Sequence, residues 1–353
     1  MAKKKEEVVL EQTKSAIKLQ GVVSRMDSDH AFKEGETGSG KPYKSLRFTV
    51  ITKDAEGEKN EVPVELFGME QDEVYAYNMK KKEGKRFPFE SRDNLPDGYH
   101  LFGVRVGLQR DEEGKIISEN LHPYDAVEEI FNELQDGMHI YLNGEIEISE
   151  YEKDGEKKEQ KRFVMKSLGL LKKDIDFEAE NFEETAVFEQ EMVFVDMEVD
   201  RETKKAKVIG RTIGYGGKFA NGSFIIDGND KDLEGLIKAF KKLKFGAFMK
   251  VYGKVVNRVE FVEAEETDAK PVDKKNPFAT VGKEKHKSLE KRTSREYTNE
   301  LQIEGVEAES FVTTKYKEED FVLPVEEEKA DDTNDDNPFA GTGDDKEDGD
   351  DLW

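Results

Sequence analysis

Short stretches in which apolar and polar residues alternate run along most of the chain. They are rich in β-branched and aromatic residues and are separated by Gly, Asn and Asp, a pattern that is typical of β-strands. In the first half of the chain the predicted strands lie at 16–26, 43–53, 61–69, 139–150 and 161–171. In the second half they lie at 192–200, 206–215, 223–228 and 247–258.

Two stretches have helical spacing instead, with apolar residues at i, i+3, i+4 and i+7. The first contains Val127, Ile130, Phe131 and Leu134, and the second contains Leu233, Leu236, Ile237 and Phe240. Asp125 and Glu128 form the predicted capping box of the first helix. Gly137 and Gly246 are the predicted stops of the two helices.

The two helices reveal an internal repeat. When Gly137 is aligned with Gly246, Gly144 falls on Gly253, so each copy has a second glycine seven residues later inside the next strand. A glycine inside a strand typically marks a bulge or a tight bend in a small barrel. A helix between the third and fourth strands is the element order of the OB fold, a five-stranded Greek-key barrel.

The predicted fold class is mostly β with minor α: two tandem OB-fold-like five-stranded barrels and a disordered acidic C-terminal tail. The predicted segments are an N-terminal arm (1–14), a first barrel (15–175) with an insertion at about 70–120, a second, basic barrel (187–262), a polar linker (263–317) with a candidate strand at 301–312, and the tail (318–353). The insertion contains the basic residues Lys80, Lys81, Lys82, Lys85 and Arg86.

The charge distribution changes the picture that the net charge alone suggests. The chain carries −24 overall, but residues 201–258 contain 14 basic and 5 acidic residues. Residues 318–353 contain 16 acidic and 2 basic residues, a density that cannot pack into a core and is typical of a solvated tail. A basic module joined to an acidic tail is the pattern that a functional hypothesis has to explain.

The sequence favours a cytoplasmic protein that is not an enzyme. It contains no cysteine, no apolar run long enough to span a membrane and no secretory apolar region after its basic start, so we expect the cytoplasm, that of a bacterial host if a phage encodes the chain. The segment Gly35–Lys41 matches most of a P-loop, but Pro42 stands where the magnesium-binding Ser or Thr belongs. The histidines have no metal-site spacing, so neither a metal nor a cofactor is predicted.

The strongest chemical signal lies on one face of the predicted strand 247–258. Side chains alternate between the faces of a strand, so Met249, Val251 and Val255 are expected in the core. The opposite face carries Phe248, Lys250, Tyr252, Lys254, Val256 and Arg258. Aromatic rings interleaved with cations suit single-stranded nucleic acid, because bases stack on the rings and phosphates follow the cations.

Further candidate single-stranded DNA contacts lie elsewhere in both copies. In the first barrel they are Tyr43, Arg47, Phe67, Lys161 and Arg162. In the second barrel they are Arg211, Lys218 and Phe219, the last two in a glycine-rich hairpin. The alternative is that these aromatic residues cover a second hydrophobic layer or a neighbouring subunit.

The two helix–glycine–strand units, the strand 62–68 and the C-terminus resemble the OB-fold single-stranded DNA-binding proteins of bacteriophages and bacteria. The resemblance implies a protein that coats and protects single-stranded DNA in replication, recombination or repair. In this family an acidic tail ending in an apolar or aromatic tip docks on replication and recombination proteins. The matching residues here are Asp350, Asp351, Leu352 and Trp353, and the segment ending at Phe339 is similar to the bacterial tip.

Two departures from the family and two rival functions stay open. The chain ends in Leu-Trp where bacterial members end in Pro-Phe, and two barrels on one chain leave the oligomeric state undetermined. One rival is a non-catalytic protein-interaction, virion or regulatory factor whose acidity serves solubility. The other is single-stranded RNA binding, since OB barrels accept either nucleic acid.

Overall fold

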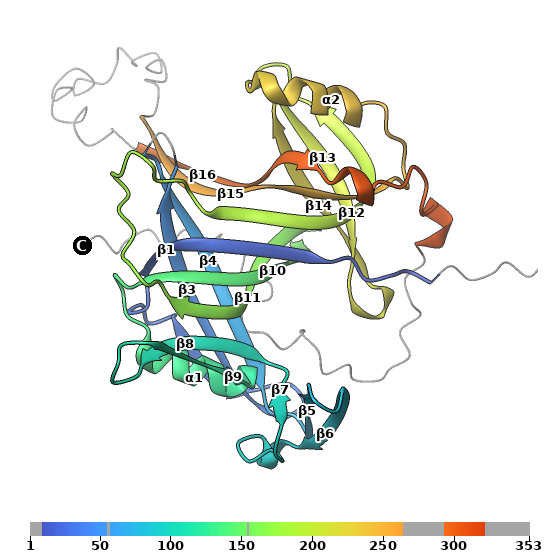
Figure 1. Ribbon diagram of the computed structural model, residues 1–353. Helices are drawn as coiled ribbons and strands as arrows, with labels where there is room; N and C mark the ends of the chain where they lie inside the picture. Colours follow the sequence, from blue (N-terminus) through green and yellow to red (C-terminus); the bar gives the residue numbers. More distant parts are fainter. Residues whose placement is uncertain (1–8, 55–56, 154, 264–292, 322–353) are drawn as a thin grey trace, which may run out of the picture.

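The computed structural model describes residues 9–54, 57–153, 155–263 and 293–321 (Figure 1). Five strands of the first half close into a barrel: β1 (Ser15–Ser24), β3 (Pro42–Lys53), β4 (Lys59–Met69), β10 (His139–Lys153) and β11 (Glu156–Leu170). The ring runs β1-β3-β4-β11-β10 and returns to β1, and β4 and β11 pair in parallel. This is an OB-type barrel, as the alternation of apolar residues predicted.

A second barrel with the same connectivity follows. It consists of β12 (Ala186–Val199), β13 (Lys205–Ile213), β14 (Phe219–Asp227), β15 (Phe248–Glu263) and β16 (Thr293–Val306). β12 pairs with both β13 and β15, and β14 pairs in parallel with β16. The prediction of a mostly β protein with two OB-like five-stranded barrels is therefore confirmed.

The fifth strand of the second barrel is β16, which lies beyond the sequence-based barrel boundary at 262. Its inward residues Leu301 and Ile303 are fully buried, and it pairs along its whole length with β15. The segment at 301–312, which the sequence left as a candidate extra strand in a linker, thus contributes to the barrel itself. The predicted acidic tail lies almost entirely outside the described residues.

Each barrel carries one helix between its third and fourth strands, as predicted. The helix α1 (Pro123–Glu133) buries Ala126, Val127 and Ile130, and α2 (Glu234–Phe240) buries Ile237 and Phe240. The predicted capping box of α1 is wrong. His122 is the N-cap, and its Nδ1 accepts a hydrogen bond from the Tyr124 N–H at 3.2 Å.

The glycines that revealed the repeat mark bulges at equivalent places. The β10–β11 register shifts at Gly144, and the β15–β16 register shifts at Gly253. A Cβ added to Gly144 would lie 2.2 Å from the Val164 carbonyl oxygen, and one added to Gly253 would lie 1.8 Å from that of Gln302. Only glycine allows the opposing strand to approach so closely.

The two barrels are joined edge to edge. β1 and β12 pair antiparallel, with Ile17 opposite Phe188 (Figure 1). Their core residues form one hydrophobic cluster that extends through both barrels. Each barrel also reaches across the junction: the backbone N–H of Ser223 on β14 donates to Glu159 on β11 at 2.9 Å, and that of Asn257 on β15 donates to Asn60 on β4 at 2.8 Å.

The insertion in the first barrel is an ordered module. It comprises a three-stranded sheet of β5 (Glu73–Asn78), β6 (Glu83–Pro88) and β7 (Tyr99–Leu101), the short helix η1 (Phe89–Ser91), and the pair β8 (Val104–Arg110) and β9 (Ile116–Leu121). Arg92 fixes the module to α1, donating to both oxygens of Asp125 at 2.7 and 3.0 Å. The P-loop-like segment is a turn between β2 (Phe32–Glu36) and β3, with no helix after it.

The buried N-cap predicts a pH dependence of stability. Burial lowers the pKa of His122 to about 4, below the unfolded value of about 6.5. The native state therefore keeps the His122 ring neutral. Up to about 3 kcal/mol of the free energy of unfolding is lost as the pH falls from about 6.5 towards 4. His122→Asn keeps a good N-cap without a titrating ring. In urea titrations between those two pH values, the wild-type free energy of unfolding should fall relative to that of the variant; a constant difference would contradict this account.

Candidate nucleic-acid interface

The outer face of β15 keeps two of its predicted contact residues accessible. Tyr252 is 45% exposed, and its ring lies over Gly305 on β16, where a Cβ would lie 2.3 Å from the Tyr252 hydroxyl. The Lys254 side chain is half exposed, with its Nζ 2.9 Å from Glu304. Met249, Val251 and Val255 are buried, as the strand parity predicted.

The neighbouring cation, Lys250, lies between two carboxylates. Its Nζ is 2.9 Å from Glu189 on β12 and 3.0 Å from Glu307 after β16. The hydrogen bond to Glu189 and, to a smaller extent, the one to Glu307 raise the pKa of Lys250. A phosphate would have to displace these partners, so the positive charge of β15 is largely compensated within the protein.

The two ends of the same face are covered. Phe248 pairs with Val312, and the Nζ of Lys315 lies 4.1 Å from the Phe248 ring centroid. At the other end Val256 is buried and Arg258 is paired with Asp54. The predicted exposure of Val256 is wrong, because β15 packs there on β4 of the first barrel.

In the first barrel the structure brings Tyr43 and Phe67 together. Their ring centroids are 5.5 Å apart on the neighbouring strands β3 and β4, and both side chains are partly exposed. Arg47 lies on β3 opposite Glu65, which is two residues from Phe67 on β4. These three residues form a small surface with two rings and one cation.

Lys161 and Arg162 are not on an exposed face. The Arg162 side chain is 9% exposed, 2.8 Å from Glu147 and 3.7 Å from Glu65. The Nζ of Lys161 lies 3.2 Å from the Ser223 hydroxyl of the second barrel. Lys161 thus links β11 to β14 of the second barrel, whereas the carboxylates beside Arg162 belong to the first barrel itself.

Arg211 and Phe219 also lie in a packed cluster. The Arg211 guanidinium carbon is 4.8 Å from the Phe219 ring centroid and 4.5 Å from that of Phe321, and burial lowers its pKa. By contrast, Lys218 is exposed in the β13–β14 hairpin, which also contains Tyr215. Tyr215 is 74% exposed.

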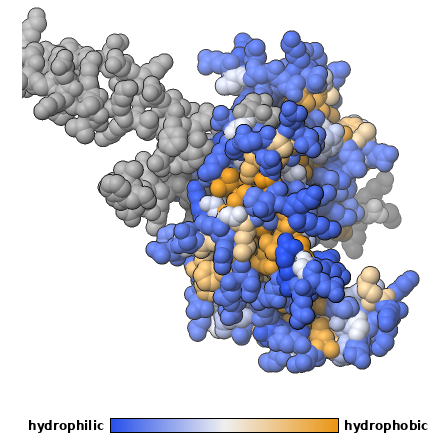
Figure 2. All heavy atoms as spheres, turned by 60° about the vertical axis from the view of Figure 1, so that its left-hand side comes forward, coloured by the Kyte–Doolittle hydropathy of each residue, from blue (hydrophilic) through white to orange (hydrophobic). Residues whose placement is uncertain are grey.

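The insertion carries exposed apolar and aromatic residues that were not among the predicted contacts. Figure 2 shows a mostly hydrophilic surface that hydrophobic patches interrupt. Among the exposed large hydrophobic residues of the described chain, Tyr75, Met79, Phe102 and Ile117 belong to the insertion. The alternation in 73–78, where Val74 and Ala76 are buried, is the sequence signal that could have identified Tyr75.

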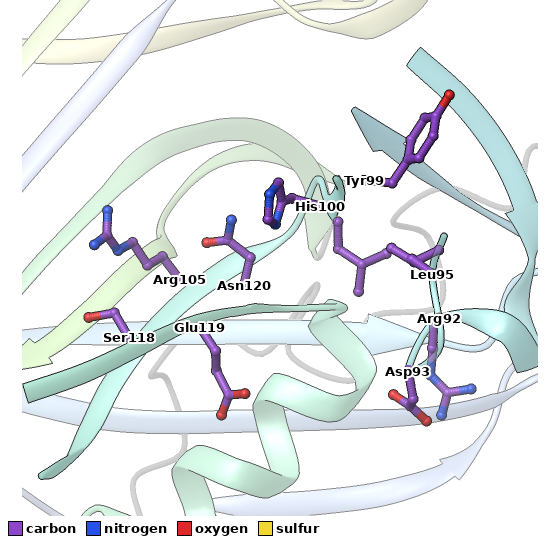
Figure 3. Close-up of a pocket in the computed structure, with 10 residues that line it drawn as sticks. Arg92, Asp93, Leu95, Tyr99, His100, Arg105, Ser118, Glu119 and Asn120 are labelled. Atoms are coloured by element: carbon purple, nitrogen blue, oxygen red, sulfur yellow. The ribbon is translucent and has the colours of Figure 1, made fainter. Parts of the chain in front are cut away.

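A shallow depression of about 600 Å³ also lies on the insertion (Figure 3). Its lining includes His100, Arg105, Glu119 and Asn120. His100, Arg105 and Asn120 extend to the same side, whereas Glu119 points away from them (Figure 3). The depression therefore presents two basic side chains and an amide on one side.

The described residues contain no group of three or more His, Asp or Glu side chains placed to hold a metal ion. None of the helices described there is long and apolar enough to cross a membrane. The predicted partner-binding residues Phe339, Asp350, Asp351, Leu352 and Trp353 lie outside the described residues.

The fold and surface define the class: a protein of two OB-type barrels joined through their first strands. The family model described as YorF matches residues 14–336, so this chain belongs to the YorF family. The comparison with curated proteins gave no match.

The chain is also similar to solved single-stranded DNA binding proteins. The wild-type protein from Thermus aquaticus is 15% identical, with 70% of this chain and 87% of that chain covered and a TM-score of 0.36. A deletion mutant of that protein is also 15% identical, with 70% of this chain and 88% of that chain covered and a TM-score of 0.35. The SSB of Plasmodium falciparum, in a complex with ssDNA, is 12% identical, with 46% of this chain and 99% of that chain covered and a TM-score of 0.21. These likenesses are too weak to assign a function.

Proposed function

We propose that this protein is a non-catalytic single-stranded DNA-binding protein that coats the strand with both barrels. The observation that carries the proposal is the pair of closed OB-type barrels, with two rings accessible on the strands of the first and one ring on those of the second. OB barrels bind oligonucleotides across such strands, and stacking on a ring tolerates any base. We therefore expect little sequence preference.

The contacts fall into two groups. In the first barrel, Tyr43 and Phe67 offer neighbouring rings with Arg47 beside them. In the second barrel, Tyr252 and Lys254 supply a ring and a cation, and Lys218 adds an exposed cation at the β13–β14 hairpin.

The other predicted contacts have a supporting role in this proposal. Phe248, Arg211 and Phe219 pack under the C-terminal segment 307–321. Lys161 and Arg258 fix the contact between the barrels, and Arg162 pairs with carboxylates of its own barrel. They hold the exposed rings in place without having to touch DNA.

Within a cell, the protein would protect single strands during replication, recombination or repair. The family resemblance stated from the sequence supports this role, together with a bacterial or phage origin and a place in the cytoplasm. The arrangement of the described residues offers no metal site, and the proposal requires no cofactor.

One observation favours a protein-interaction factor as a second candidate. The cations Lys250 and Lys254 are already paired with carboxylates of the same chain. Such compensation suits a neutral docking face better than a phosphate-binding one. Single-stranded RNA binding is the third candidate. A protein distinguishes RNA from DNA at a given site through a contact to the 2′-hydroxyl.

The first prediction concerns the ligand. Single-stranded DNA should bind more tightly than duplex, and the affinity should fall as salt rises, because cations released from the phosphates must return. Anisotropy titrations with single-stranded DNA, single-stranded RNA and duplex at two salt concentrations provide the measurement. No binding to any of the three nucleic acids would favour the protein-interaction candidate, and tighter binding to RNA would replace DNA as the ligand.

The second prediction concerns Tyr252. Tyr252→Ala removes an exposed ring and should cost about 1–3 kcal/mol of single-stranded DNA binding, with a thermal unfolding midpoint close to that of the wild type. Tyr252→Phe keeps the ring and should bind like the wild type. If the phenylalanine variant also loses affinity, or if the alanine variant unfolds, Tyr252 does not act as a stacking platform.

We also propose that the acidic tail recruits replication or recombination proteins through Asp350, Asp351, Leu352 and Trp353, with Phe339 as a second apolar anchor. The proposal rests on sequence: the aspartates would steer the segment towards a basic pocket, and an aromatic residue suits a buried anchor. The same carboxylates would compete with DNA for the basic surface while no strand is bound.

The third prediction therefore concerns a deletion of residues 344–353. It should abolish binding to the partner while leaving single-stranded DNA affinity unchanged or higher, because a competing anion is gone. Pull-down of host replication proteins and DNA titration measure the two effects separately. The double variant Leu352→Ala with Trp353→Ala keeps every aspartate. It should lose partner binding without a change in single-stranded DNA affinity. Retained partner binding in both variants would remove Leu352 and Trp353 from the proposal.

A further inference from the structure

The insertion carries a pair of aromatic rings that project into water. Tyr75 is 47% exposed and Phe102 is 73% exposed. The two ring centroids lie 5.9 Å apart in an edge-on arrangement. The backbone N–H of Phe102 donates to the Tyr75 carbonyl oxygen at 3.1 Å, so the two residues are held as neighbours. Rings fixed side by side at a surface are suited to a ligand that covers them.

The sheet of the insertion explains why these rings face outward. On β5 the residues Val74 and Ala76 are buried, so Tyr75 and Tyr77 lie on the opposite face. Across the sheet, Tyr75 pairs with Arg86 on β6 and Tyr77 pairs with His100 on β7. The outward face thus alternates rings with basic side chains.

A glycine on the neighbouring strand makes room for the Tyr75 ring. A Cβ added to Gly84 on β6 would lie 1.7 Å from the Tyr75 hydroxyl oxygen. The ring therefore lies against the backbone of β6 instead of standing away from the sheet. One edge of the Tyr75 ring contacts the backbone of β6, and the rest of the ring stays accessible.

The charge around this face suits a polyanion. Residues 79–86 contain five basic residues and one acidic residue, in a chain whose net charge is −24. Lys80, Lys81 and Lys82 are exposed in the turn between β5 and β6. The Arg86 side chain is 75% exposed, and its partner Glu73 is 3.6 Å away at the surface, a pairing that water and salt weaken.

The depression in Figure 3 borders this face through His100. Arg105 on β8 pairs with Asn120 on β9, and both extend to the same side as His100 (Figure 3). All three side chains are exposed. They offer hydrogen-bond donors to an anion at the edge of the aromatic face.

The insertion is fixed to the first barrel, so the face has a defined position. Besides the Arg92–Asp125 pair, Phe89 packs on His122, with ring centroids 5.1 Å apart, at the start of α1. The insertion also begins directly after β4, where Met69 pairs with Tyr43. A single strand of DNA that stacks on Tyr43 and Phe67 would therefore leave the barrel beside the insertion.

We propose that the insertion is an additional single-stranded DNA contact, on which bases stack against Tyr75 and Phe102 while phosphates meet Arg86, His100 and Arg105. This inference rests on the proposed function and extends the binding path of the first barrel. The insertion lengthens the bound segment, so its effect grows with the length of the oligonucleotide.

The test uses the full chain and oligothymidylates of two lengths: one of about 10 nucleotides, within the range that a single OB barrel covers, and one several times longer. Tyr75→Ala combined with Phe102→Ala should weaken binding of the long strand about tenfold or more. Binding of the short strand should change by less than about threefold, because the barrels suffice for it.

Two matched variants isolate the rings. Tyr75→Phe combined with Phe102→Tyr keeps both rings and should bind the long strand like the wild type. Ile117→Ala removes an exposed apolar side chain from the same insertion and should also leave affinity unchanged. Circular dichroism melts check that all variants are folded.

The outcomes separate the two proposals. If the wild type binds the long strand and the double alanine variant binds it equally well, the insertion contact is overturned and the barrels remain the site. The insertion contact is also overturned if Ile117→Ala weakens binding as much as loss of the rings does. If the wild type binds neither strand, the proposed function itself fails.

Discussion

The antiparallel pairing of β1 with β12 is the interaction on which the rest of the structure depends. It joins the first strands of the two barrels, with Ile17 and Phe188 opposite each other and both fully buried. β1 pairs with β12 over residues 15–19 and with β3 of its own barrel over residues 22–24, so the register of this one strand positions both barrels. It places β11 against β14 and β15 against β4, and each barrel then completes part of the other's surface.

This reciprocal packing determines which basic residues can meet a ligand. Lys161 and Arg258 are drawn into the contact between the barrels, where they meet the Ser223 hydroxyl and the Asp54 carboxylate. Arg162 is buried beside two carboxylates of its own barrel. Burying a guanidinium without partners would be costly, so the acidic residues beside them are a structural requirement. The charge that remains at the surface is smaller than the basic composition of the second half suggests.

The accessible rings consequently carry much of the proposed binding. They are distributed over three places: the Tyr43–Phe67 pair, Tyr252, and the Tyr75–Phe102 pair of the insertion. The first and third adjoin at the end of β4, whereas Tyr252 lies on β15 of the other barrel. Base stacking adds to the phosphate contacts, so such a surface can hold a single strand of DNA even though the chain is acidic overall.

Local signals along the chain were enough to predict the two barrels, because alternation, helical spacing and the paired glycines at 144 and 253 can each be recognised within a few residues. They indicated a candidate strand at 301–312 but did not assign it to the second barrel, because β16 begins with the polar residues 293–300, and its pairing with β15 is a long-range contact. The burial of Val256 and the pairing of Arg258 with Asp54 depend instead on how the second barrel packs on the first. Strand parity gives the face of a side chain, but what covers that face comes from residues some two hundred positions away.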